Sequence, residues 1–158
     1  MLKNRCEKGF SLIELLVAVA IILIISAIAI PNLLRSKVSA NEASAVGSVR
    51  TILGANNTYS ATYNIGFPTS LAKLCPAKPA TSAAADLIDS LLCAGAKSGY
   101  SFTYVAGPAV GGTITTFTLN ADPISVGQTG QRHFFANQTG VIRFNTAAAA
   151  TVADKPIS

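Results

Sequence analysis

The chain begins with a short polar segment and continues with a long apolar one. Over residues 10–30 only two serines and Glu14 are polar. As a helix that rises about 1.5 Å per residue, this segment would be roughly 32 Å long, which matches the hydrocarbon core of a bilayer. We predict a membrane-spanning helix over residues 10–30, with a bend at Pro31, whose ring removes a backbone hydrogen bond.

Past the apolar segment, the pattern becomes that of an amphipathic helix over residues 31–62. Apolar side chains recur at spacings of three, four and seven or eight, as expected of a helix that packs one face on a domain. These positions are Leu33, Leu34, Val38, Val46, Val49, Ile52, Leu53 and Tyr63. The opposite face, which we expect to meet water or a partner, carries Arg35, Lys37, Asn41, Glu42, Ser48 and Arg50.

Residues 63–99 are predicted to form a connecting region at the start of a head that extends to residue 158. Two short helical turns are expected within it, over residues 69–74 and 83–92. The second would place its leucines inward, and these are Leu87, Leu91 and Leu92. Asp86 and Asp89 would then lie on its solvated face.

From residue 100 the period changes to two, the pattern of half-buried strands. The four segments that show it are residues 100–105, 113–119, 133–135 and 141–144. Residues 137–140 supply a glycine-containing turn for a hairpin between the last two. We therefore predict an α+β fold, in which the long helix packs on a roughly four-stranded antiparallel sheet over residues 100–145. An Ala/Thr-rich tail over residues 146–158 is expected to be loose.

Side chains for catalysis or metal binding are scarce in this sequence. The one histidine, His133, has no cysteine or carboxylate near it along the chain, and we expect it at a solvated strand position. Asp122 precedes Pro123 and is typical of a turn, while Asp154 stands alone. The glycines of residues 107–112 lack the Lys-Ser/Thr ending of a phosphate-binding loop. We predict no enzyme activity, catalytic residue, cofactor or metal site.

The charge distribution gives no indication of nucleic-acid binding. The formal net charge is +5, but three of the twelve basic residues, Lys3, Arg5 and Lys8, lie before the apolar segment. The others are scattered singly and form no basic stripe, so no specific nucleic-acid site is predicted. Basic residues that precede a span favour a cytoplasmic location for that end, so we expect the C-terminal portion to be exported.

Glu14 is the most informative residue of the apolar segment. An acid within a span costs on the order of 2.5–3.5 kcal/mol, so it is by default a functional residue that needs a partner. The polar leader, residues 1–9, ends in Gly9 directly before Phe10. Cleavage between Gly9 and Phe10 would create a cationic amine about one helical turn from Glu14.

Two other interpretations of this N-terminal region remain open. Residues 26–29 have the small-x-small pattern of an ordinary signal peptidase site, although the apolar segment exceeds the usual hydrophobic region of about 7–15 residues. The segment could also be an uncleaved anchor, which would leave Glu14 without an amine nearby.

The three cysteines are consistent with loss of the leader. Cys6 lies in the leader, so cleavage would leave Cys75 and Cys93. In an oxidising compartment this pair can form a disulfide, whose loop-closure term is worth about 3 kcal/mol. The alternative is that both remain small buried thiols.

The residues around the predicted cleavage point resemble the N-terminal signature of type IV prepilins and the related type II secretion pseudopilins. The resemblance is dense over about residues 8–35. Its residues are Lys8, Gly9, Phe10, Ser11, Leu12, Ile13 and Glu14, then Pro31, Asn32, Leu33 and Leu34. The resemblance implies a pilin fold and a prepilin peptidase that cleaves after Gly9 and N-methylates Phe10. It also implies that Glu14 pairs with the N-terminal amine of a neighbouring subunit.

For function, the resemblance implies a structural subunit of a type IV pilus, with expected roles such as adhesion or motility. Its expected partners are copies of itself in a helical filament, the prepilin peptidase, the inner-membrane assembly machinery, and lipid before assembly. It would be a single-pass inner-membrane protein first and part of an extracellular filament afterwards.

Three alternatives to a major pilus subunit remain. The first two, a type II secretion pseudopilin and a minor pilin, share this N-terminal region. Major pseudopilins carry a calcium site in their C-terminal region, and the sequence shows no comparable cluster of oxygen ligands. The third is a membrane-tethered module whose sheet binds a ligand.

Overall fold

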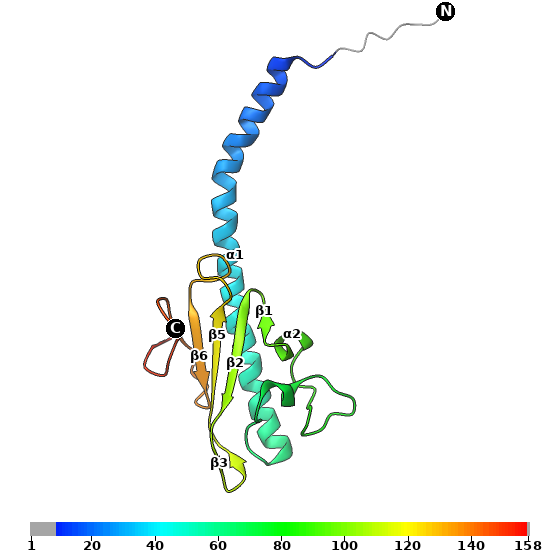
Figure 1. The fold of residues 1–158 in the computed structure, drawn as a ribbon, viewed down its shortest axis with the longest axis vertical. Coiled ribbons are helices and arrows are strands. Elements are labelled where there is room, and N and C mark those ends of the chain that lie inside the picture. The colour runs from blue at the N-terminus through cyan, green and yellow to red at the C-terminus, as the bar shows by residue number, and fades with distance from the viewer. Residues whose placement is uncertain (1–8, 158) are drawn as a thin grey trace, which may run out of the picture. The chain divides into compact units, whose positions relative to one another are not determined.

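The computed structural model of the chain describes residues 9–157. The chain divides into two compact units, which meet in sequence between Ser36 and Lys37. Helix α1 (Leu12–Tyr63) runs through both units (Figure 1). Most of the predicted leader, including Cys6, lies outside the described residues.

In the first unit, α1 exposes its apolar side chains on all sides. Between residues 9 and 36 every side chain is exposed except that of Ser26, which is half-buried. Leu33 and Leu34 were expected to begin the packed face of the helix, and that expectation is wrong. Both are exposed and belong to the first unit, whereas the buried face begins further along α1.

In the second unit, α1 buries one face against the sheet. The buried residues are Glu42, Ala45, Ser48, Val49, Ile52, Leu53, Ala55, Asn56 and Tyr59. The spacing of three and four confirms the amphipathic pattern. Glu42 and Ser48 were expected on the opposite face, exposed to water or to a partner, and their burial corrects this. The buried face is wider than the apolar stripe, because Glu42 and Asn56 find hydrogen-bond partners inside it.

The sheet has six antiparallel strands in the order β1-β2-β5-β6-β7-β8. Their bounds are Ala96–Lys97 for β1, Tyr100–Ala106 for β2, Phe117–Pro123 for β5, His133–Asn137 for β6, Arg143–Asn145 for β7 and Lys155–Pro156 for β8. Strands β2 and β5 pair along their whole length, from Tyr100 opposite Pro123 to Ala106 opposite Phe117. The α+β class and the helix-on-sheet architecture are thereby confirmed.

The sheet differs from the prediction in the number and limits of its strands. Strands β1 and β8 each have two residues, too few to show a period. The predicted strand at 113–119 is divided. Its first part is β4 (Thr113–Ile114), which pairs with β3 (Ala109–Val110) in a separate hairpin, and its second part opens β5.

One hydrophobic core joins α1 to the inner face of the sheet, and Figure 1 shows β2, β5 and β6 lying alongside the helix. Alternate residues of β2 and β5 point into this core, including Tyr100, Phe102, Leu119 and Ala121. Full burial of one large apolar side chain contributes about 1.5–3 kcal/mol. Packing of these side chains therefore supplies most of the stability of the second unit.

The connecting region contains a 3-10 turn, η1 (Leu71–Leu74), and one short helix, α2 (Ser90–Cys93). The predicted helix over residues 83–92 is wrong, since Asp86 has a φ of 54°, which a right-handed helix does not allow. Asp89 instead caps α2, where its Oδ1 accepts hydrogen bonds from the backbone N–H groups of Leu91 and Leu92. Leu91, which was expected to face inward, is exposed, whereas Leu92 is buried.

The C-terminal tail is ordered by hydrogen bonds, which corrects the expectation of a loose segment. Strand β8 pairs with β7, and Ala150 is buried. The Asp154 carboxylate accepts hydrogen bonds from the N–H and hydroxyl of Thr151 and from the amide of Asn145. Thr151 is a local donor three residues away, whereas Asn145 reaches Asp154 because β7 and the tail run side by side.

Candidate functional site

The predicted cleavage point lies in exposed backbone just before α1. Gly9 and Phe10 have no regular secondary structure, and 77% of Phe10 is exposed. A Cβ at Gly9 would meet nothing within 4 Å. The basic residues Lys3, Arg5 and Lys8 lie outside the described residues. The Gly9–Phe10 bond is thus accessible, as cleavage by a peptidase requires.

Glu14 lies in the first turn of α1, where it helps to start the helix. Its Oε2 accepts a hydrogen bond of 2.9 Å from the backbone N–H of Ser11. This is one half of a capping box, in which an acid at the third helical position satisfies an N–H at the helix start. Sequence reasoning missed this contact, although the Ser-x-x-Glu spacing is visible in residues 11–14.

Between Leu15 and Ile30 the first unit exposes almost only apolar side chains. Helix α1 is the one described helix that is long and apolar enough to cross a membrane, and no residue of the window that meets this test is buried. A helix that is apolar all round requires either lipid or other protein around it. Pro31 lies inside this helix, and the bend expected there stays a prediction.

Comparison with known families gives one match, which covers this segment. Residues 4–30 match the family model described as the prokaryotic N-terminal methylation motif, and this motif is the signature of type IV prepilin-like proteins. The chain therefore carries the prepilin-type signature over these residues. No curated protein and no solved structure matches the chain.

The signature has two general consequences. It implies processing by a prepilin peptidase and assembly of the pilus type. Together with the apolar helix, it also indicates that the chain is anchored in a membrane before assembly.

In the second unit, the structure joins Cys75 to Cys93 in a disulfide, with Cα atoms 5.3 Å apart. The bond ties the end of η1 to the end of α2. The connecting region also packs on the core through Leu74, Ile88 and Leu92. This disulfide therefore closes a surface segment whose interior side is already buried.

Glu42 is a buried carboxylate that sequence reasoning placed on the wet face. Its Oε1 accepts the backbone N–H groups of Gln131 at 2.8 Å and Arg132 at 3.1 Å, and its Oε2 accepts Arg132 Nε at 2.8 Å. Burial alone would raise the pKa of Glu42, but the hydrogen bonds from Gln131 and Arg132 outweigh it, so the net pKa is lowered. Next to it, Asn41 Nδ2 donates to Thr129 O.

His133 and Asp122 form a second polar pair, which corrects both predictions made for them. Asp122 lies in β5 rather than in a turn, and His133 lies in β6 and is largely shielded from solvent. The register that sets Ala121 opposite Phe134 brings the two side chains together, with Nδ1 and Oδ1 2.6 Å apart. Among the described residues, no three His, Cys, Asp or Glu side chains gather as a metal site would require.

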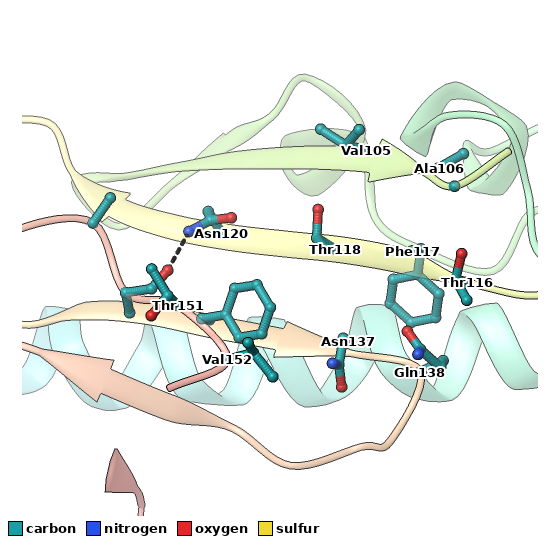
Figure 2. A pocket seen from close by; sticks show the side chains of 14 residues that line it. Val105, Ala106, Thr116, Phe117, Thr118, Asn120, Asn137, Gln138, Thr151 and Val152 are labelled. Carbon is teal, nitrogen blue, oxygen red and sulfur yellow. Dashed lines mark hydrogen bonds between the residues drawn. The ribbon is translucent and has the colours of Figure 1, made fainter. Parts of the chain in front are cut away.

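A hollow of about 660 Å³ lies beside β5, β6 and the tail (Figure 2). Its lining includes Thr118, Asn120, Asn137 and Val152, and Asn120 Nδ2 donates to Ala150 O across one side. None of the described residues that line it is charged, a histidine or a cysteine. The hollow therefore offers no acid–base pair of the kind that catalysis uses.

Proposed function

We propose that this chain is the structural subunit of a type IV pilus, processed after Gly9 and assembled through the apolar half of α1. The observation that carries the proposal is Glu14, the only acid between residues 8 and 41, four residues beyond the predicted new N-terminus. The accessible Gly9–Phe10 bond and the prepilin signature over residues 4–30 support it.

In the proposed mechanism, hydrolysis of the Gly9–Phe10 bond frees the nitrogen of Phe10 as an amine, to which the peptidase transfers a methyl group from a methyl donor. The methylated amine is cationic once protonated. Glu14 of an incoming subunit then pairs with the amine of a neighbour. Pairing removes two charges from apolar surroundings at once, although desolvation leaves little net gain in stability. The main effect of the pair is to set the register between subunits.

Cohesion of the filament would come from the exposed apolar side chains of α1. In the first unit, the large ones are Phe10, Leu12, Ile13, Leu15, Leu16, Val17, Val19, Ile21, Ile22, Leu23, Ile24, Ile25, Ile28, Ile30, Leu33 and Leu34. Lipid surrounds them before assembly and neighbouring helices replace it afterwards. Since lipid is as apolar as these side chains, close packing rather than dehydration stabilises the assembled state.

The main alternative is a type II secretion pseudopilin. In our proposal, Asp154 orders the tail by hydrogen bonding rather than through a cation. Its carboxylate accepts bonds from Thr151 and Asn145, and the Arg143 guanidinium donates to its backbone carbonyl at 2.8 Å. Carboxylate oxygens occupied by N–H and O–H donors, with a guanidinium nearby, do not suit Ca²⁺. This favours the pilus subunit over a calcium-dependent major pseudopilin.

Two measurements test the proposal. The intact mass of the exported protein should show loss of residues 1–9, one methyl group on Phe10 and two hydrogens missing from the Cys75–Cys93 pair. Electron microscopy of the cell surface should show filaments that contain this chain. Any other N-terminus would remove the basis of the mechanism. The correct N-terminus with no surface filament would favour the pseudopilin.

A further inference from the structure

The loop between β5 and β6, residues 124–132, lies at the end of the second unit that contains its first residues, near Lys37 and Asn41 of α1. Asn41 Nδ2 donates to Thr129 O at 2.9 Å, and Glu42 accepts the N–H groups of Gln131 and Arg132. Asn41 is one helical turn, about 6 Å of rise, beyond Lys37, the first residue of this unit. In Figure 1, the loop and the β3 hairpin lie at opposite ends of the sheet.

The loop exposes two aliphatic side chains and no charge over residues 124–131. Ile124 is 64% exposed and Val126 is 63% exposed. The remaining residues of this stretch are glycine, serine, threonine and glutamine. A single exposed aliphatic residue is ordinary on any protein. Two of them on an uncharged loop beside the chain's entry point form a small apolar tip.

Most backbone N–H groups of the loop already donate within the protein. Those of Gln128 and Thr129 donate to the carbonyl of Ser125, and that of Gly127 donates to the carbonyl of Gly130. The N–H of Ile124 donates to the carbonyl of Gly99. Backbone that leaves bulk water needs such internal partners. The loop can therefore enter a less polar environment without leaving these groups unsatisfied.

Two basic side chains lie near the point where the loop contacts α1, with Lys37 one helical turn before Asn41. Lys37 is exposed, and Arg132 keeps more than a third of its side chain exposed while it pairs with Glu42. An apolar tip with cations nearby is an arrangement with which proteins contact lipid headgroups, since the apolar groups enter the acyl boundary and the cations stay among the phosphates.

We propose that residues 124–132 form a membrane-contact loop, which rests on the lipid interface while the subunit awaits assembly, with Ile124 and Val126 at the acyl boundary. The proposal rests on the membrane-anchored precursor state and commits to lipid as the occupant. The loop limits how the head can turn about its anchor, and it leaves the lipid when the subunit enters the filament.

The test uses the full chain in vesicles of phosphatidylethanolamine and phosphatidylglycerol. Cys6→Ser removes the extra thiol, and a polarity-sensitive fluorophore is attached to Ile124→Cys or Val126→Cys. Val110→Cys is the matched control, since Val110 is 71% exposed and lies in the β3 hairpin at the other end of the sheet. Ile22→Cys reports on the membrane anchor itself. Quenching is measured with lipid that carries a spin label near the headgroup for the loop and Val110, and with lipid labelled deep in the acyl chain for Ile22, which lies near the middle of the predicted span.

We expect a blue shift and strong quenching at Ile124 and Val126, neither at Val110, and the same result when protein is diluted in lipid. Quenching at Ile22 without quenching at the loop overturns the membrane-contact loop and leaves the anchor intact. A shift at the loop that disappears on dilution overturns it in favour of a second copy of the chain. No quenching at Ile22 overturns the membrane-anchored state and this inference together.

Discussion

The two units of this chain differ in whether their apolar side chains are exposed or buried. The first unit, up to residue 36, exposes nearly all of them on a single helix. The second unit buries its apolar residues between α1 and the sheet and satisfies its buried polar groups internally. The first unit therefore depends on its surroundings for stability, whereas the second can be stable by itself. Substitutions in the two should affect different measurements.

The largest effect is expected at the cleavage point. Gly9→Val places a branched side chain next to the bond to be cut, so processing should stop and filaments should disappear. Retention of the precursor mass is the measurement. Gly54→Ala is the matched control, because a Cβ there also meets nothing within 4 Å. A mature protein of unchanged mass from Gly9→Val would show that the cut lies elsewhere.

The next effect separates assembly from stability. Glu14→Ala removes the partner of the N-terminal amine, so filament yield should fall to near zero while insertion and cleavage continue. The melting temperature of the head should not change, because Glu14 lies in the first unit. Asp86→Asn is the control acid in the second unit and should leave filaments intact. Wild-type piliation with Glu14→Ala would contradict the proposed pairing.

The third prediction concerns the second unit alone. Replacing both Cys75 and Cys93 by serine should lower the free energy of unfolding of the head by about 3 kcal/mol, since the bond restricts the unfolded chain. Denaturant unfolding of the detergent-solubilised chain checks this. Cleavage after Gly9 should be unaffected. If unfolding is unchanged, the packing of Leu74 and Leu92 alone holds the connecting region.

A smaller effect is expected at Glu42. Glu42→Gln keeps the shape of the side chain but removes the charge that Arg132 faces. The free energy of unfolding of the head should fall by about 1–3 kcal/mol. Because the folded-state pKa of Glu42 is lowered, its stabilisation is present above its ordinary value of 4.5 and is lost as pH falls through the folded-state pKa. Between neutral pH and pH 3, the melting temperature should therefore fall more for the wild type than for Glu42→Gln. An equal fall in the two proteins would contradict the lowered pKa of Glu42.

The smallest effect is expected at a surface ion pair. Lys97 Nζ lies 2.7 Å from Asp89 Oδ2, and Asp89 is exposed while Lys97 is half-buried. Lys97→Met should change the free energy of unfolding by less than about 1 kcal/mol, since water and salt screen such pairs. A larger loss in denaturant unfolding would show that the cap of α2 depends on Lys97.

The periodicity of the sequence predicted long elements well and short ones poorly. Helix α1 and strand β2 follow runs of five or more residues with one period, whereas β1 and β8 have two residues each and only their partners define them. The helix expected over residues 83–92 failed because one residue, Asp86, adopts a left-handed conformation. Local patterns average over such single positions and miss them.

The candidate site divides in the same way. The Gly9–Phe10 junction and Glu14 lie at the start of the apolar segment over residues 10–30, and such local features are visible in the sequence alone. The pairs Glu42–Arg132 and Asp122–His133 join residues that are 90 and 11 positions apart. A hydropathy pattern predicts a solvent-exposed position for each such residue, since its partner is not visible along the chain.

The sequence by itself determined that this chain carries a prepilin-type N-terminal segment, an apolar helix with one acid, and a helix-on-sheet head. Those features depend on period, length and residue type, which are properties of neighbouring positions. Only the tertiary structure decided that Glu42 is buried, that His133 has a carboxylate partner, and that the tail is ordered around Asp154. The burial and pairing of these polar groups depend on strand register and helix packing, which bring distant residues together.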